Sequence, residues 1–437
     1  MSLQKRDGRL HLGAFIYYAG HHHAGWRHSE SGAENMFKLP YYVELAKTAE
    51  RGRFDMLFLA NLLYVQPSEG AANGMLDPVV VLSAIAGATG KLGLAGTIST
   101  TYSEPYNVAR AMASLDHISG GRAAWNIVTS QLDLEALNYG REKHPDHALR
   151  YEMAEEFTEV VAKLWDSWGE DTLLLDRAGG RFADFGQLKE VDYKGRWYGA
   201  KGYLNVPRSP QGRPVLIQAG SSSQGQGFAG RFADVVFTAQ QSLESARQFH
   251  DAVGDQLAIA GRARGSAKIM PGLSPIIGST DAEAKRRHEE LQELITPAMA
   301  VEVISRFVNY DLSGYSADQP LPQLPIDLVA SSNGMKSRVQ LFMDLAYNKK
   351  LSILELGRIF LGARGHLQFI GTPERLADLM IQWYEEGGCD GFNIMPPVLP
   401  GDFSLFVDEV VPILQRRGRF RQDYEGDTLR DHLGLEK

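Results

Sequence analysis

Small and hydroxyl-bearing residues follow an apolar run near the middle of the chain. The run at 214–219 ends in Ala219, and Gly220, Ser221 and Ser222 come next, before a predicted helix. Backbone N–H groups at a helix N-terminus attract anions, and small residues let an anion approach the backbone closely. One interpretation is a phosphate-binding turn. The alternative is an ordinary serine N-cap, which is common where a helix begins.

The glycines at 225–230 (GQGFAG) match the G-x-G-x-x-G pattern of dinucleotide-binding turns. Their placement is poor, because such a turn needs its glycines directly at the junction of strand and helix. Here the first glycine lies well beyond Ala219, the last residue of the predicted strand. Close packing of the helix explains these glycines better than a nucleotide site does.

A second polar strand end lies at 124–130, where the sequence AWNIVTS passes from apolar residues to hydroxyl groups. An uncharged end with hydrogen-bond donors and acceptors suits a flat heterocycle. Capping of the strand is the alternative interpretation.

The loop at 20–32 carries four histidines, at positions 21–23 and 28. Three successive residues cannot all point at one ion from a regular element, and no H-E-x-x-H pattern lies nearby. We therefore expect no metal. A functional loop beside the first strand is favoured over a metal site, and an inert surface loop is the plain alternative.

These residues need elements to position them, and predicted strands and helices alternate along the chain. Such alternation indicates a parallel sheet, and eight units fit a (β/α)8 TIM barrel, although an open doubly wound sheet stays possible. In a barrel, the strand ends named above would meet at one face. The expected strands lie at 10–16, 54–60, 91–98, 122–128, 214–219, 234–238, 267–277 and 390–395. The expected helices lie at 39–51, 78–88, 106–117, 151–168, 224–232, 243–261, 281–295, 373–386 and 403–417. We expect a single domain over 1–437, with insertions near 170–212 and 297–350.

Composition narrows the classes of protein. The chain has 437 residues and a formal net charge of −8, which argues against a nucleic-acid-binding surface. Cys389 is the single cysteine, so no intrachain disulfide can form, as expected in a reducing cytoplasm. No apolar stretch has the length and flanks of a signal peptide or a membrane span. We expect a cytoplasmic protein that does not bind membranes.

Several motifs in order along the chain carry a resemblance. They are GWRH at 25–28, FDMLFLAN at 54–61, STTY at 99–102 with PY at 105–106, LDH at 115–117, GR at 121–122, WNIVTS at 125–130, RY at 150–151, QAGSS at 218–222 and DGFN at 390–393. Together they resemble flavin-dependent monooxygenases of the bacterial luciferase-like superfamily. The branch is that of the nitrilotriacetate, dibenzothiophene-sulfone and long-chain alkane monooxygenases.

The resemblance implies a TIM barrel that uses FMN, reduced by a separate NAD(P)H:flavin reductase. Reduced FMN and O2 would form a C4a-(hydro)peroxyflavin, which passes one oxygen atom to a small organic substrate. It also implies a homodimer or homotetramer. The segment 297–350 would be a lid over the site. The alternatives are an F420-dependent oxidoreductase of the same superfamily and a non-catalytic flavin-binding protein.

The resemblance also assigns site residues. Those expected to face the flavin ring are Asn61, Thr97, Thr129, Ser130 and Gln131, and those expected at its phosphate are Arg150, Tyr151, Ala219, Gly220, Ser221 and Ser222. Gln131 stands where the alkane enzyme has a histidine, and an apolar residue near Val303 replaces a second one. A first-loop cysteine is absent too, with Ala19 or Gly20 in its place. The remaining candidates for catalysis are His22, His23, Gln131 and Tyr64. Arg27 is a candidate partner for a substrate anion.

Overall fold

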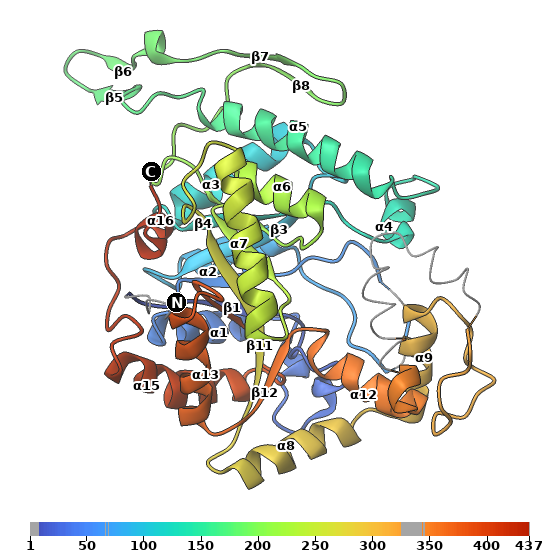
Figure 1. The fold of residues 1–437 in the computed structure, drawn as a ribbon. Helices are drawn as coiled ribbons and strands as arrows, with labels where there is room; N and C mark the ends of the chain where they lie inside the picture. The colour runs from blue at the N-terminus through green and yellow to red at the C-terminus, as the bar shows by residue number, and fades with distance from the viewer. Residues whose placement is uncertain (1–7, 66, 69, 325–342, 344–345, 437) are drawn as a thin grey trace.

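The structure is a computed structural model and describes residues 8–65, 67–68, 70–324, 343 and 346–436. Its centre is a ring of parallel strands (Figure 1), closed by the pairings of β10 with β11 and of β13 with β1. In hydrogen-bonding order the ring contains β1 (His11–Ile16), β2 (Met56–Leu59), β3 (Gly93–Ser99), β4 (Ala123–Val128), β9 (Val215–Gln218), β10 (Val235–Thr238), β11 (Lys268–Ile277) and β13 (Gly391–Ile394). All eight strands expected from the sequence form this ring, so the barrel prediction is confirmed.

A ninth strand was missed. β12 (Leu367–Gly371) pairs only with the second half of β11, from Leu273 to Ile277, whereas the first half of β11 pairs with β10. The ten-residue length of β11 makes both pairings possible. The sequence of β12, LQFIG, is short and only partly buried, so it lacks the continuous apolar run by which the other strands were recognised.

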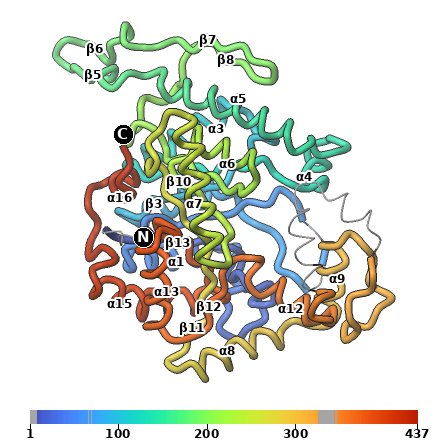
Figure 2. Tube along the Cα trace, in the orientation of Figure 1, coloured from blue at the N-terminus to red at the C-terminus, as the bar shows by residue number. Residues whose placement is uncertain are grey.

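Helices surround the barrel and follow the expected ranges closely (Figures 1 and 2). Local signals explain their starts: α2 begins at Pro78, and the side chain of Asp77 accepts hydrogen bonds from the N–H groups of Val79 and Val80. The expected helices are α1 (Leu39–Arg51), α2 (Pro78–Ala86), α3 (Pro105–Ser119), α5 (His147–Trp165), α6 (Ser223–Phe232), α7 (Leu243–Ile259), α8 (Asp281–Glu293), α13 (Pro373–Glu385), and α14 (Gly401–Leu405) continued by a π-helical turn (Phe406–Val410) and α15 (Val411–Arg416). Further helices, which the sequence did not predict, are α4 (Asp133–Asn138), α9 (Pro297–Phe307), α12 (Ile353–Ala363) and α16 (Leu429–Leu433).

The strands place alternate side chains on the two sides of the barrel wall. On β1, Leu12, Ala14 and Ile16 pack outward against the helices, whereas Phe15 belongs to the cluster inside the barrel. That inner cluster also contains Met56, Phe58, Ala95, Ala124, Val215, Ile217, Val235, Phe237, Met270, Met395, and Leu429 and Leu433 of α16. The barrel interior is therefore a packed core.

The expected insertion near 170–212 contains two antiparallel hairpins. They are β5 (Leu173–Asp176) with β6 (Arg181–Ala183), and β7 (Val191–Lys194) with β8 (Gly199–Gly202). Figures 1 and 2 show both hairpins beyond α5, on the outside of the molecule. They contribute nothing to the barrel wall.

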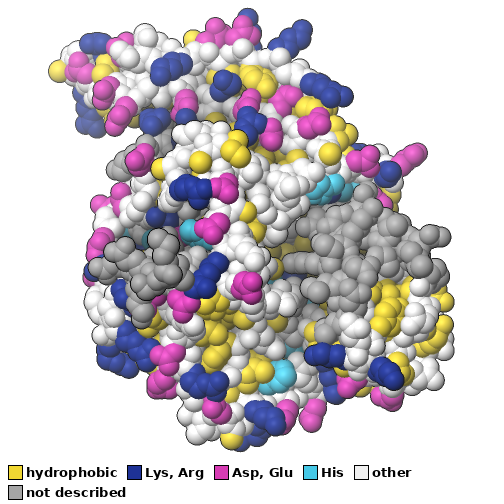
Figure 3. Space-filling view, viewed as in Figure 1, with side chains coloured by type: hydrophobic (Ala, Val, Ile, Leu, Met, Phe, Trp, Pro, Cys, Tyr) yellow, Lys and Arg dark blue, Asp and Glu magenta, His cyan; other side chains and the backbone are white. Residues whose placement is uncertain are grey.

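The segment 297–350 begins with α9, which packs on α12 through Ile304, Phe307 and Leu356. Residues 325–342 and 344–345 lie outside the described residues, so the expectation of a lid stays a prediction. On the face drawn in Figure 3, basic and acidic side chains are intermixed. Within the described ranges, no helix combines the length and the apolar character needed to cross a membrane.

Candidate active site

A cavity of about 760 Å³ opens at the carboxyl ends of the strands, the face at which TIM barrels hold their active sites. Its lining includes Phe15, Phe58, Thr97 and Phe237 from four different strands. The predicted residues that line this barrel-mouth cavity are Asn61, Thr97, Thr129, Ser130, Gln131, Tyr151, Ala219, His23 and Tyr64. The predicted residues that do not line it are His22, Arg150, Gly220, Ser221 and Ser222.

Two amide oxygens at the cavity lack hydrogen-bond partners. Asn126 Nδ2 donates to Thr97 Oγ1 at 2.9 Å, and Thr97 Oγ1 donates to the carbonyl oxygen of Leu59 at 2.8 Å. Asn126 Oδ1 and Gln218 Oε1 are buried and have no partner among the described residues. Because buried polar atoms are normally paired, these two acceptors fit a ligand that carries N–H or O–H donors. A flavin ring offers such donors.

The turn after β4 is held in an unusual backbone conformation. Ser130 has φ +59°, the left-handed region that few non-glycine residues adopt. Its Oγ lies 2.9 Å from Ser99 Oγ and 2.9 Å from Glu135 Oε1. The other oxygen of the buried Glu135 accepts from the N–H groups of Gln131 (2.9 Å) and Leu132 (3.2 Å). Glu135 thus fixes three consecutive residues at the cavity rim, a role that the sequence analysis missed.

Arg150 also holds the turn after β4. Its Nη1 donates to the carbonyl oxygen of Ser130 and contacts His144 Nε2, while Tyr102 Oη lies 2.5 Å from His144 Nδ1. Burial lowers the pKa of both Arg150 and His144. The structure therefore brings Arg150 to the turn after β4, whereas Tyr151 points toward the segment at 219–222.

The segment at 219–222 makes a close approach to Tyr151. A Cβ at Gly220 would lie 2.6 Å from Tyr151 Oη, so only glycine fits there without movement. Ser222 Oγ accepts from Gly225 N at 3.1 Å and caps the ten-residue α6, while Ser221 Oγ lies 3.2 Å from Thr238 Oγ1. The N-cap interpretation is thus correct for Ser222. The segment also lies against the first turn of α6, since a Cβ at Gly220 would lie 3.3 Å from Gly225 Cα.

Two histidines of the loop at 20–32 have different surroundings. His22 is 2% exposed, neither ring nitrogen has a hydrogen-bond partner among the described residues, and burial lowers its pKa to about 3. His23 lines the cavity, and burial, with the nearby guanidinium groups of Arg364 and Arg306, lowers its pKa to about 4. Burial raises the pKa of Tyr64 to about 12. At neutral pH both histidines are neutral and Tyr64 keeps its proton.

Aromatic side chains that the sequence analysis did not single out form the floor of the cavity. Phe15 stacks on Phe58 with ring centroids 4.5 Å apart, and Phe237 meets Phe15 edge-on at 5.3 Å. The sequence signal was present, since each lies in an apolar strand. Apolar strands do not reveal which residues face inward when both faces are buried.

Arg27 does not reach the cavity. Its Nη1 donates to the carbonyl oxygen of Leu294, and the residue lines a separate hollow with Trp26 and Met299. Arg27 therefore lies outside the barrel-mouth cavity, and its pairing with a substrate anion stays a prediction. In the described part of the chain, no group of three or more His, Cys, Asp or Glu side chains is placed to hold a metal ion.

A closed parallel barrel with a polar-rimmed cavity at its carboxyl face defines a TIM-barrel enzyme. The sequence profile of the family described as luciferase-like monooxygenase matches residues 14–391. The chain belongs to this family and is a flavin-dependent monooxygenase.

Individual relatives cover the whole chain. N-acetyl-S-(2-succino)cysteine monooxygenase of Bacillus subtilis is 48% identical over 100% of this chain and 98% of its own length. Nitrilotriacetate monooxygenase component A of Aminobacter aminovorans is 41% identical over 98% of this chain and 96% of its own. A crystal structure of riboflavin lyase with modified FMN and the substrate riboflavin has a TM-score of 0.86 and 32% identity, covering 98% of this chain and 96% of that one.

Proposed function

We propose that the protein is the oxygenase of a two-component system. It would bind reduced FMN made by a separate NAD(P)H:flavin reductase and transfer one atom of O2 to a small organic substrate. The observation that carries this proposal is the barrel-mouth cavity. It is lined by Asn126 and Gln218, whose buried Oδ1 and Oε1 have no partner among the described residues, and by Ala219, at the start of the turn that leads into α6. A flavin ring and its phosphate need these two kinds of contact.

The residues present fit FMN in two groups. Around the ring we place Asn61, Thr97, Asn126, Thr129, Ser130 and Gln131. At the phosphate we place Tyr151, Ala219, Gly220, Ser221 and Ser222, with Arg150 holding the backbone of Ser130. When bound, the reduced flavin supplies the electrons that activate O2.

The chain's own side chains would exclude water and orient the substrate. The rings of Phe15, Phe58 and Phe237 form an apolar floor, which keeps water from the reacting centre. His23, Gln131 and Tyr64 line the cavity and can hydrogen-bond to a substrate, with the Tyr64 hydroxyl as a donor. His22 does not line the cavity, and we assign it to the packing of the loop.

The substrate and the partners are the finer parts of the proposal. The Bacillus subtilis relative makes N-acetyl-S-(2-succino)cysteine the first compound to test. The Aminobacter aminovorans relative is named as component A, which supports a second component that delivers reduced flavin. A homodimer or homotetramer remains our expectation for the assembly.

Oxygen transfer can be tested with the purified protein, an NADH:FMN reductase, FMN, NADH and N-acetyl-S-(2-succino)cysteine under ¹⁸O2. We expect product that gains one ¹⁸O atom, and none when FMN or the reductase is omitted. If the protein binds reduced FMN but oxidises no compound in a panel of sulfur, nitrogen and carboxylate compounds, the proposed substrate class would be overturned. Binding of F420 in place of FMN would favour the F420-dependent alternative.

A further inference from the structure

Arg364 lies at the boundary between two cavities. It follows the last residue of α12 and has φ +52°. Its guanidinium carbon lies 3.8 Å from the centroid of the Tyr17 ring, and both residues line the barrel-mouth cavity. Stacking on Tyr17 holds the plane of the guanidinium and leaves its N–H edges available to a partner.

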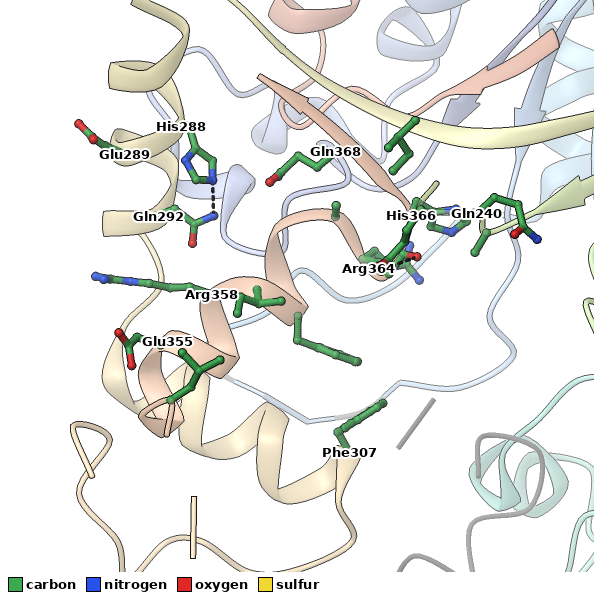
Figure 4. A pocket seen from close by; sticks show the side chains of 18 of the residues that line it. Gln240, His288, Glu289, Gln292, Phe307, Glu355, Arg358, Arg364, His366 and Gln368 are labelled. Atoms are coloured by element: carbon green, nitrogen blue, oxygen red, sulfur yellow. Dashed lines mark hydrogen bonds between the residues drawn. The ribbon is translucent and has the colours of Figure 1, made fainter. Parts of the chain in front are cut away.

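The second cavity has a volume of about 1280 Å³ and lies between α8, α12 and β12. Figure 4 shows His288 and Gln292 on α8, Arg358 and Glu355 on α12, and Arg364 with His366 toward the other end. The two cavities share Phe307, Phe360 and Arg364 as lining residues. A molecule in the barrel mouth therefore meets Arg364 where the cavity borders this second space.

The charge of Arg364 has no counter-ion in the described ranges. Among the described residues, no carboxylate lies within ion-pair distance of its guanidinium, and no group accepts a hydrogen bond from it. Arg306, the other cation of the barrel mouth, is paired with Glu302. The cavity's carboxylates are engaged too: Glu135 holds the turn after β4, and Asp133 Oδ1 accepts from the N–H of His144 at 2.9 Å.

The histidines and tyrosines close to Arg364 add no second free charge. Burial and the nearby guanidinium lower the pKa of His21 and His23, so both are neutral at neutral pH. Burial keeps Tyr18 and Tyr64 protonated by raising the pKa of each. The second cavity, by contrast, is lined by three carboxylates, those of Glu289, Glu293 and Glu355, against the guanidinium groups of Arg358 and of Arg364 itself, so the balance of charge there disfavours an anion. The guanidinium of Arg364 thus lines the barrel mouth with no partner among the described residues.

We propose that Arg364 receives an anionic group of the substrate, most simply a carboxylate. A planar guanidinium can donate two parallel hydrogen bonds to the two oxygens of a carboxylate. The inference rests on the proposed function, because it assigns part of the same cavity to the substrate. It makes Arg364 a specificity-determining residue and places the charged end of the substrate beside Tyr17.

Succinate and its uncharged analogue succinamide are the probes for this assignment. Calorimetric titration would compare the wild-type protein with Arg364→Gln and Arg364→Lys, each with and without saturating reduced FMN under anaerobic conditions. Arg358→Gln is the matched control, since Arg358 lines the second cavity but not the barrel mouth. Thermal unfolding would verify that each variant is folded.

We expect the wild type to bind succinate and to discriminate against succinamide. Arg364→Gln should weaken succinate binding roughly 10- to 100-fold, the loss expected when hydrogen bonds to a charged group are removed. Arg364→Lys should lose less, and Arg358→Gln should bind as the wild type does.

Absence of succinate binding by the wild type, equal binding by Arg364→Gln, or a loss confined to Arg358→Gln would overturn the assignment. The flavin arm separates the two proposals. If reduced FMN binds normally but succinate binding does not depend on Arg364, only the anion site is overturned. If succinate binding depends on Arg364 but reduced FMN does not bind, only the flavin assignment is overturned.

Discussion

The backbone of Gly220 passes so close to the phenol of Tyr151 that a Cβ at position 220 would lie 2.6 Å from Tyr151 Oη. This approach joins the loop after β9 to helix α5, two segments far apart in the sequence. It also sets the width of the cavity end at which we place the phosphate.

Gly220→Ala should therefore weaken FMN binding. The added methyl group must displace the side chains of Gln218, whose Nε2 would be the atom closest to it, and of Tyr151. We expect the Kd to rise by about tenfold or more, equivalent to ~1.4 kcal/mol. Quenching of flavin fluorescence during titration measures this effect. Gly227→Ala on α6 is the control, because the nearest atom to its Cβ would be 3.8 Å away. Equal FMN affinity in both variants would show that the phosphate does not bind at this turn.

Glu135→Ala should disturb the cavity rim. The substitution leaves the Ser130 hydroxyl and the N–H groups of Gln131 and Leu132 without their acceptor. Loss of a buried acceptor of this kind costs about 1–3 kcal/mol in the free energy of unfolding. Urea unfolding would measure the cost, and a flavin titration should show weaker binding. Glu142→Ala, in the exposed loop after α4, should change neither quantity; a matching loss there would mean that the effect of Glu135 is not specific.

His23→Ala should uncouple the reaction, since His23 lines the barrel mouth and His22 does not. We expect more NADH and O2 to be consumed per molecule of oxygenated product, because part of the O2 is released as hydrogen peroxide. An oxygen electrode and a peroxide assay would measure the ratio. His22→Leu should retain the wild-type ratio. The reverse result would show that His22 contacts the substrate.

The histidine loop should also make stability depend on pH. The pKa of His22 is about 3 in the folded protein, against 6.5 for an unperturbed histidine. Between these values the unfolded chain binds a proton that the folded chain does not. The free energy of unfolding should therefore fall as the pH drops below 6.5, by up to about 1.4 kcal/mol per pH unit for this group.

His23, with a folded pKa of about 4, contributes with the same sign. Urea unfolding between pH 7 and 5 measures the slope, and His22→Leu should reduce it. An unchanged slope in that variant would show that His22 is protonated in the folded protein.

The barrel could be predicted because its ring strands are apolar runs and its helices have clear start signals, such as Asp77 before Pro78. Of the glycines at 225–230, Gly225 and Gly230 make the close contacts expected of packing residues, whereas Gly227 leaves room for a Cβ. A Cβ at Gly225 would lie 2.9 Å from the Gly220 backbone, and one at Gly230 would lie 2.6 Å from the Gln256 carbonyl oxygen on α7. These features depend on residues that are close in sequence or on simple periodicity.

The remaining features depend on contacts between distant segments. Neither β12 nor α9 stands out in sequence, because each is stabilised by packing on a partner, β11 and α12 respectively. The role of Glu135 could not be predicted from the sequence, because only the fold of the turn after β4 brings its carboxylate to Ser130. Arg364 likewise becomes distinctive only when α12 sets it over Tyr17, a residue that lies hundreds of positions earlier in the chain.

The assignment of the barrel mouth to a reduced flavin can be tested by anaerobic titration with FMN and with photoreduced FMN, followed by flavin absorbance and protein fluorescence. We expect the reduced form to bind with a Kd lower by about tenfold or more, or ~1.4 kcal/mol. We also expect Gly220→Ala to weaken this binding. Failure of the protein to bind either form of FMN would contradict the assignment of the barrel mouth to a reduced flavin.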